Sequence, residues 1–135
     1  MMPATLRALR AEFGLSFDWI ADHAGVDGAQ LAAWEAGQAP VPDAVARLMA
    51  ELDRRAEQLV RHAVETVEAI MVEQGAPPEA VELHRYATDT PLWDRHPDFR
   101  PLPASWHRAA LARLEKALAR RGIRARYSDQ SPRVH

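Results

Sequence analysis

The residues with the clearest chemical potential in this chain are the cations near its C-terminal end. Between residues 108 and 126 there are seven Arg and Lys side chains and one carboxylate, Glu115. The cations are Arg108, Arg113, Lys116, Arg120, Arg121, Arg124 and Arg126. Guanidinium and ammonium groups pair with phosphates and carboxylates. The run 113–126 is therefore interpreted as a solvated helix face with cations near a helix C-terminus, as a phosphate-binding surface for DNA or RNA, or as a contact for an acidic chain.

Histidines and carboxylates are the other candidates for chemistry. His84, His96 and His107 lie in the C-terminal part of the chain, and Asp94 and Asp98 flank His96. No pair of these histidines has the spacing that places two ligands on one helix face, so no metal site is predicted. The chain also contains no glycine-rich phosphate loop and no nucleophile motif. We therefore expect no catalytic residues, no cofactor and no enzymatic activity.

Composition limits the class of protein further. The 135 residues include no cysteine, which excludes disulfides and thiolate metal sites. Their hydrophobic content of 47% argues against global disorder. No apolar run approaches the roughly 20 residues that cross a bilayer, and the N-terminus lacks the layout of a signal peptide. A soluble cytoplasmic protein with no membrane partner is expected.

The stretch 15–42 has the sequence signals of two short helices joined by a tight turn. Ser16 is a suitable N-cap for the first helix, and Gly25 can adopt the left-handed conformation that ends it. Asp27 can cap a second helix of about nine residues, which is expected to reach Ala36 and to end at Gly37. Two helices around a glycine turn are typical of a helix-turn-helix unit, whose second helix usually lies in the DNA major groove.

These residues resemble the phage-repressor-like (XRE/Cro-type) helix-turn-helix regulators. The matching positions are Leu15, Ser16, Ala21, Gly25, Val26, Leu31, Trp34, Glu35 and Gly37. The longer order of elements, with a module that begins near HRYATDTPLWDRHPD, resembles the anti-CRISPR-associated repressors and their uncharacterised relatives. This resemblance implies a homodimer, joined through its C-terminal module, that binds an inverted repeat in double-stranded DNA and represses its own operon.

The same resemblance indicates which residues would face DNA bases. They are Gly28, Ala29, Gln30, Ala32 and Ala33. Only Gln30 offers hydrogen bonds to a base edge, where it could pair bidentately with adenine, whereas alanines could only contact thymine methyl groups. The spacing from Asp27 to Gln30 is also that of a capping box, in which the Gln30 amide would bond back to the Asp27 backbone.

Phosphate contacts are expected from Arg7 and Arg10, with Arg47 as a further candidate. Gln38 stands where the family often has Lys or Arg. Residues 1–42 carry five carboxylates against two arginines, so the expected DNA reader is acidic. Two functions follow. The first is a DNA-binding transcriptional regulator, and the alternative is a protein-interaction or antitoxin-like module on a degenerate helix-turn-helix scaffold with weak or no DNA binding.

The predicted fold is mainly α. A five-helix, phage-repressor-like domain is expected over residues 1–75, including a first helix at 3–13 and a long helix at 42–74. A small α+β module that serves for dimerisation is expected over 76–128, with strands near 80–87 and 123–127. Residues 129–135 are expected to be a frayed tail. Two strands alone make a marginal sheet, which favours a homodimer that supplies more strands.

The long helix carries a heptad-like seam of apolar residues. Its members are Val45, Met49, Leu52, Ala56, Leu59, Ala63, Thr66 and Ile70. A seam of this kind either packs inside the monomer or pairs two copies.

Overall fold

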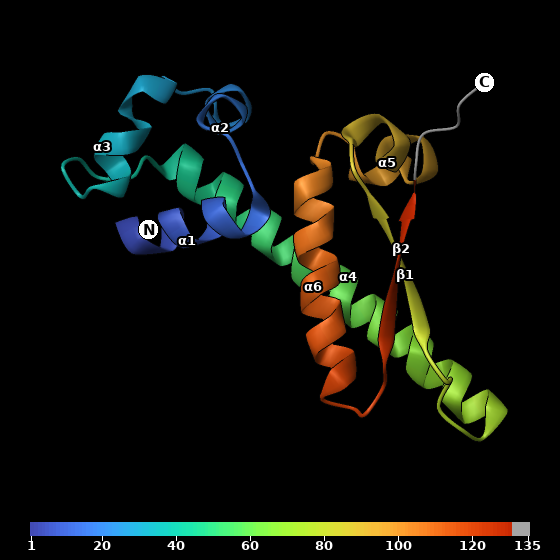
Figure 1. Cartoon of the computed structure of the whole chain (residues 1–135). Coiled ribbons are helices and arrows are strands. Elements are labelled where there is room, and N and C mark those ends of the chain that lie inside the picture. The colour runs from blue at the N-terminus through green and yellow to red at the C-terminus, as the bar shows by residue number, and fades with distance from the viewer. Residues whose placement is uncertain (131–135) are drawn as a thin grey trace. The chain divides into compact units, whose positions relative to one another are not determined.

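The computed structural model describes residues 1–130, which form a mainly helical chain with one small sheet (Figure 1). The chain divides into two compact units, Met1–Arg55 and Ala56–His135. One long helix, α4 (Asp43–Gln74), contributes residues to both units. Among the described residues, no helix is both long enough and apolar enough to cross a membrane.

The N-terminal unit consists of short helices and the beginning of α4. Its other elements are α1 (Pro3–Phe13), α2 (Phe17–Ala24), the 3-10 turn η1 (Gly28–Gln30) and α3 (Leu31–Glu35). Each helix buries large apolar side chains, among them Leu6, Phe13, Ile20 and Leu31, and these exclude water from the core. The first helix has the predicted limits. Residues 1–75 contain four α-helices and one 3-10 turn, and the predicted set of five α-helices is not observed.

The second helix of the hairpin differs from the single helix predicted for residues 27–36. Its first turn is 3-10, because the Asp27 carboxylate accepts a hydrogen bond from the Ala29 N–H at 3.0 Å and the Gln30 N–H bonds to the Asp27 carbonyl at 3.3 Å. These contacts close the chain after two and three residues, which is tighter than the α-helical repeat. The α-helix proper then begins at Leu31 and ends at Glu35.

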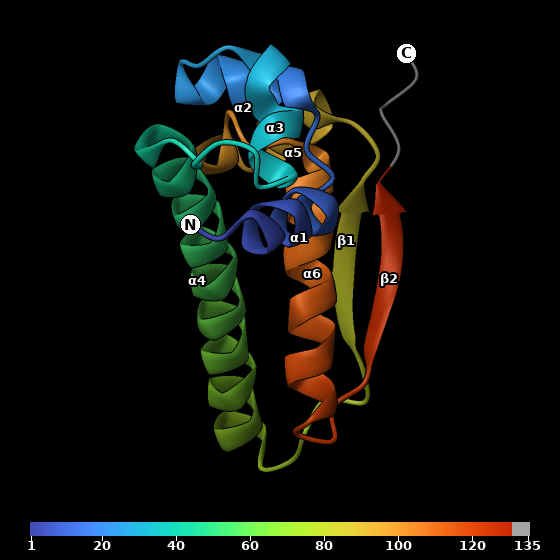
Figure 2. The ribbon, with the colours of Figure 1, turned by 90° about the vertical axis from the view of Figure 1, so that its left-hand side faces the viewer.

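The C-terminal unit places two strands beside two helices. It contains β1 (Val81–Tyr86), α5 (Asp89–Arg95), the 3-10 turn η2 (Pro97–Phe99), α6 (Ala104–Ala119) and β2 (Ala125–Gln130). The strands pair in parallel, with Leu83 opposite Tyr127. Figure 2 shows α6 beside the second half of α4 and along the strands. A core that includes Val64, Leu83 and Leu114 joins these elements.

This core explains two differences from the predicted boundaries. Val64 and Val67 of α4 pack with the C-terminal elements, so the second compact unit begins at Ala56, whereas the boundary was predicted after residue 75. Asp129 and Gln130, which were predicted to belong to a frayed tail, pair with Arg85 and Tyr86 in the sheet. The remainder of that predicted tail, residues 131–135, lies outside the described residues.

The seam of α4 is buried in its first half and turned to the surface in its second half. Val45, Met49 and Ala56 are fully buried. Toward the C-terminal end of the helix, Thr66 and Ile70 are exposed, and Val64 and Val67 take the buried positions. The first half of the seam therefore packs inside the monomer, which was one of the two predicted alternatives. The other was the pairing of two copies.

Candidate nucleic-acid interface

The two helices of the hairpin are joined as a helix-turn-helix unit requires. The Ser16 hydroxyl accepts a hydrogen bond from the Trp19 N–H at 3.0 Å, which confirms Ser16 as the N-cap of α2. Gly25 ends α2 with φ = +69°, a conformation that side chains other than glycine rarely adopt. The chain then turns at once into η1, so the second helix starts immediately beside the first.

Gly28 lies where the second helix comes closest to α2. A Cβ atom built on Gly28 would approach the Ala21 Cβ to 3.2 Å, tighter than an ordinary contact. Small residues at positions 21 and 28 therefore allow the helices to pack closely. Gly28 was predicted to face DNA bases, and the structure places it half-buried at this helix contact.

The remaining predicted base-facing residues form the outer side of η1 and α3. Ala29, Gln30 and Ala32 are exposed, and Ala33 is half-buried. Leu31 and Trp34 point inward and are buried. Within residues 1–130 the Gln30 side chain makes no hydrogen bond, so the amide is not held back against Asp27 as a capping box would require. Gln30 thus presents one polar group on an otherwise small and apolar surface.

Arg10 and Arg7 are both engaged with Glu35. The Arg10 guanidinium forms a two-pronged ion pair with the Glu35 carboxylate, whose side chain is only 10% exposed. Arg7 donates to the Glu35 backbone carbonyl at 3.3 Å. The hydrogen bond from Arg10 to Glu35 raises the pKa of Arg10, so this side chain stays charged. These contacts join α1 to the end of α3.

Arg10 was expected to contact phosphates, and its pairing with Glu35 was not predicted. The helical repeat could have shown otherwise, because Glu35 lies four residues after the inward Leu31 and next to the inward Trp34. Arg10 is also within 4.7 Å of the Phe17 ring centroid, as in a cation–π contact. Arg10 is therefore chiefly a scaffold residue.

The other groups of this surface are exposed. Gln38 and Arg47 are both solvent-accessible, and within residues 1–130 neither side chain has a hydrogen-bond or ion-pair partner. Three exposed carboxylates, Asp18, Asp22 and Asp27, belong to α2 and the turn that follows. Because exposed carboxylates repel phosphates, they would weaken the attraction of DNA to this unit.

An aromatic pair on α2 is a feature that sequence reasoning did not anticipate. The rings of Trp19 and His23 stack with centroids 4.1 Å apart. The His23 Nδ1 lies 2.8 Å from the Trp19 carbonyl oxygen, which fixes the orientation of the imidazole. Their spacing of four residues on a helix is the sequence signal that could have indicated the pair.

Among the described residues, no three or more His, Asp or Glu side chains are grouped so that they could hold a metal ion. His96 and His107 stack with ring centroids 6.1 Å apart. His107 is buried and its Nδ1 has no hydrogen-bond partner within residues 1–130. Burial, with smaller contributions from His96 and Arg108, lowers the pKa of His107 to about 4.

Comparison with known families agrees with the geometry of the N-terminal unit. Residues 4–63 match a family described as a helix-turn-helix domain. No curated protein matches the chain. The match and the geometry of α2, η1 and α3 agree that the N-terminal part of the chain has a helix-turn-helix fold, a fold that many DNA-binding proteins share.

Proposed function

We propose that this chain is a transcriptional regulator of the XRE/Cro type that binds double-stranded DNA through η1 and α3. The main support for this proposal is the exposure of Ala29, Gln30 and Ala32 on the second helix of the helix-turn-helix unit, which lies within the residues that match the family. In such domains the N-terminal part of the second helix contacts base edges in the major groove. No catalytic step is needed, because occupancy of a promoter by the protein excludes polymerase.

In this proposal the specific contact is made by Gln30. Its carboxamide can donate to and accept from one adenine, while the neighbouring alanines fit against thymine methyl groups. Arg7, Arg47 and the Gln38 amide supply contacts to the phosphates that border the groove. Arg10 holds α1 against the end of α3 and so positions the second helix.

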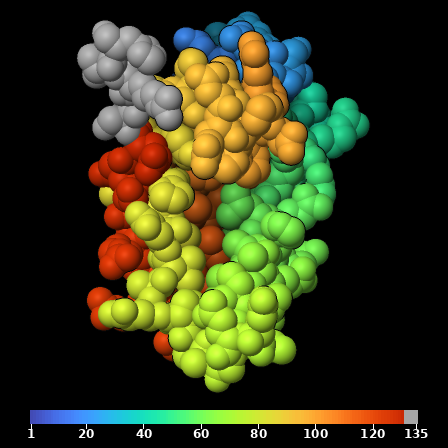
Figure 3. All heavy atoms as spheres, turned by 90° about the vertical axis from the view of Figure 1, so that its right-hand side faces the viewer, coloured from blue at the N-terminus to red at the C-terminus, as the bar shows by residue number. Residues whose placement is uncertain are grey.

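The regulator acts as a homodimer, which we infer from the open sheet of the C-terminal unit. Among the described residues the sheet has two strands, so β1 and β2 each keep one edge without a strand partner. Both strands lie at the surface in Figure 3. A second copy that adds its strands would satisfy the backbone groups of an edge. A two-fold dimer then recognises an inverted repeat, with its half-sites about 34 Å apart, and an operator of this kind would serve autoregulation.

One observation favours an alternative function. The exposed carboxylates Asp18, Asp22 and Asp27 lie on α2 and in the turn that leads into a helix with a single polar reading group. An acidic surface with few cations suits a basic protein partner better than it suits DNA. The alternative is therefore a protein-interaction or antitoxin-like module that retains only the scaffold.

A binding assay separates these two functions. The full chain is titrated against a duplex from the region upstream of its own gene and against an unrelated duplex of equal length, using fluorescence anisotropy. The regulator should prefer the upstream duplex by at least about a thousandfold, and Gln30→Ala should reduce that preference by about tenfold or more. Gln38→Ala is the matched control and should leave the preference unchanged. Equal affinity of the wild-type chain for both duplexes would contradict the regulator and favour the alternative.

A further inference from the structure

Some cations of the C-terminal unit are engaged with partners, and others at one end of α6 are not. Arg85, Arg113 and Arg121 form ion pairs with Asp129, Glu57 and Glu68, and Arg108 donates to the Tyr86 carbonyl. Within residues 1–130, Lys116, Arg120 and Arg124 are exposed and form no ion pair. These three residues, which we name the basic end, lie in the last turns of α6 and in the connection to β2.

A shallow hollow of about 580 Å³ lies between the end of α6 and the connection to β2. Two members of the basic end, Lys116 and Arg124, border it. Its other lining residues are small or apolar apart from Glu115: they are Ala119, Gly122, Ile123 and Ala125. A Cβ atom built on Gly122 would meet nothing within 4 Å, so the surface is open at this turn. A ligand as broad as a polymer backbone can therefore approach it.

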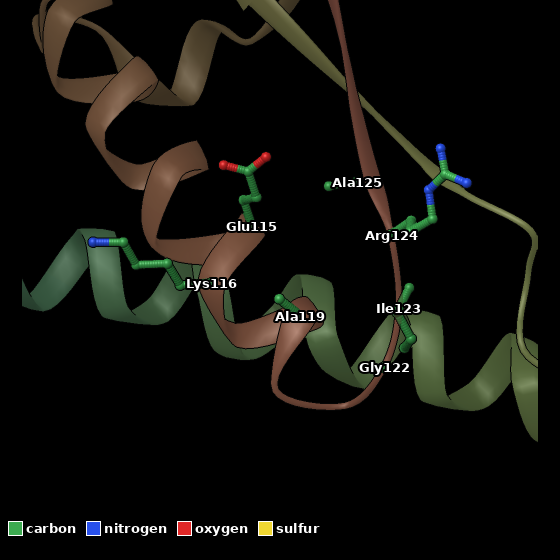
Figure 4. Close-up of a pocket in the computed structure, with 7 residues that line it drawn as sticks. All are labelled: Glu115, Lys116, Ala119, Gly122, Ile123, Arg124 and Ala125. Carbon is green, nitrogen blue, oxygen red and sulfur yellow. The ribbon is translucent and has the colours of Figure 1, made fainter.

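The directions of the side chains determine which kind of anion fits. Figure 4 shows Lys116 and Arg124 extending to opposite sides of the hollow, so their charges flank it and do not converge on one point. A small anion is bound tightly only where several donors converge on it. Separated cations instead match an anion whose charges are spread along a chain.

Carboxylates near the basic end are partly engaged. Glu115 accepts a hydrogen bond from the Tyr127 hydroxyl at 3.2 Å. Arg126, the next cation along the chain, stands opposite Glu82 in the sheet register and is left out of the basic end for that reason. The residues that line the hollow therefore carry two cations, Lys116 and Arg124, against one carboxylate, the hydrogen-bonded Glu115.

We propose that the basic end binds the phosphodiester backbone of DNA and supplies the sequence-independent part of the affinity. This inference rests on the proposed function of the N-terminal unit and explains how a regulator whose reading helix stands beside exposed carboxylates stays on DNA. The helix-turn-helix unit then selects the sequence, and the C-terminal unit contributes electrostatic attraction.

The test compares two charge-matched variants of the full chain. Lys116→Gln/Arg124→Gln removes the cations that flank the hollow, and Arg61→Gln/Arg95→Gln removes two exposed cations elsewhere in the same unit. Anisotropy with an unrelated DNA duplex over a series of salt concentrations gives the slope of log K against log salt. The first variant should reduce the magnitude of the slope by about 1.8, because each phosphate contact contributes about 0.9. The second variant should keep the wild-type slope.

The outcomes distinguish this inference from the proposed function. A wild-type slope in Lys116→Gln/Arg124→Gln would overturn the inference, and a retained preference for the upstream duplex would leave the regulator intact. A reduced slope without any preference for upstream DNA would support the basic end and contradict the regulator.

Duplex RNA and polyglutamate test whether DNA is the polyanion that the basic end binds. If the variant lost affinity for duplex RNA of the same sequence, or for polyglutamate, while keeping its wild-type DNA slope, the assignment to DNA would be overturned. Loss of the DNA slope with unchanged polyglutamate binding would support it.

Discussion

Arginine has different roles in the two units of this chain. In residues 1–55, where eight carboxylates face five arginines, Arg10 is paired with a nearly buried Glu35 and joins two helices. In the C-terminal unit, Arg120 and Arg124 are exposed without an ion-pair partner in the described part of the chain. The helix-turn-helix unit thus uses Arg10 to hold its helices together, whereas the C-terminal unit leaves Lys116, Arg120 and Arg124 exposed at one end.

The largest expected effect comes from breaking the ion pair that defines this role in the N-terminal unit. Arg10→Met leaves the Glu35 carboxylate nearly buried without its guanidinium partner, which should lower the free energy of unfolding by about 2 kcal/mol. Arg54→Met is the matched control. It breaks an exposed pair with Glu51 that water screens, so its effect on stability should be much smaller. Urea denaturation measures both, and equal losses would refute the scaffold role of Arg10.

In the C-terminal unit, the buried His107 should make the free energy of unfolding depend on pH. The expected effect is similar in size to that of Arg10→Met. The pKa of His107 is about 4 in the folded chain, below its ordinary value of about 6.5, because the imidazole is buried. The unfolded chain therefore takes up the proton first as the pH falls. The contribution of His107 to the free energy of unfolding should fall by about 2 kcal/mol from pH 7 to pH 5 and level off below about pH 4.

Denaturation of the variant His107→Leu across this pH range tests whether His107 causes the pH dependence. The variant should lose most of the slope between pH 7 and pH 5, whereas the exposed His62→Leu should keep it. An unchanged slope in His107→Leu would mean that another group titrates.

The N-caps of α2 and α5 are a further difference between the two units, with a smaller expected effect on stability. Ser16 caps α2 with its hydroxyl, whereas Thr88 occupies the N-cap position of α5 without a side-chain hydrogen bond. Ser16→Ala should lower stability by about 1 kcal/mol, and Thr88→Ala by only about 0.3 kcal/mol. Thermal unfolding followed by circular dichroism measures the two losses, and a larger loss for Thr88→Ala would contradict the observed caps.

Local signals predicted most of the secondary structure. Pro3, Ser16 and Gly25 act through backbone geometry and capping, which depend on near neighbours, and the helices they delimit were placed correctly. The alternation around Leu83 likewise indicated β1. The 3-10 turn of η1 was missed because the Asp27 carboxylate can close either a 3-10 or an α-helical turn.

Contacts between distant residues were not predictable in the same way. The pairing of Arg10 with Glu35 joins residues 25 apart, and the hollow beside Ile123 requires the relative placement of α6 and β2. The exposure of Gln30 also follows from tertiary packing, since its spacing from Asp27 allowed a capping interaction that does not form. The candidate reading residues came from a family resemblance, and only their exposure and contacts come from the structure.

The proposal that η1 and α3 read DNA is tested best by locating the DNA contact on the chain itself. An NMR titration with the upstream duplex would follow the backbone amides of the full protein. We expect the largest shift changes at Ala29, Gln30 and Ala32, with a second set at residues 116–124 that weakens as salt is raised. Changes confined to residues 116–124, with the amides of 28–33 unmoved, would contradict a reading role for the helix-turn-helix unit.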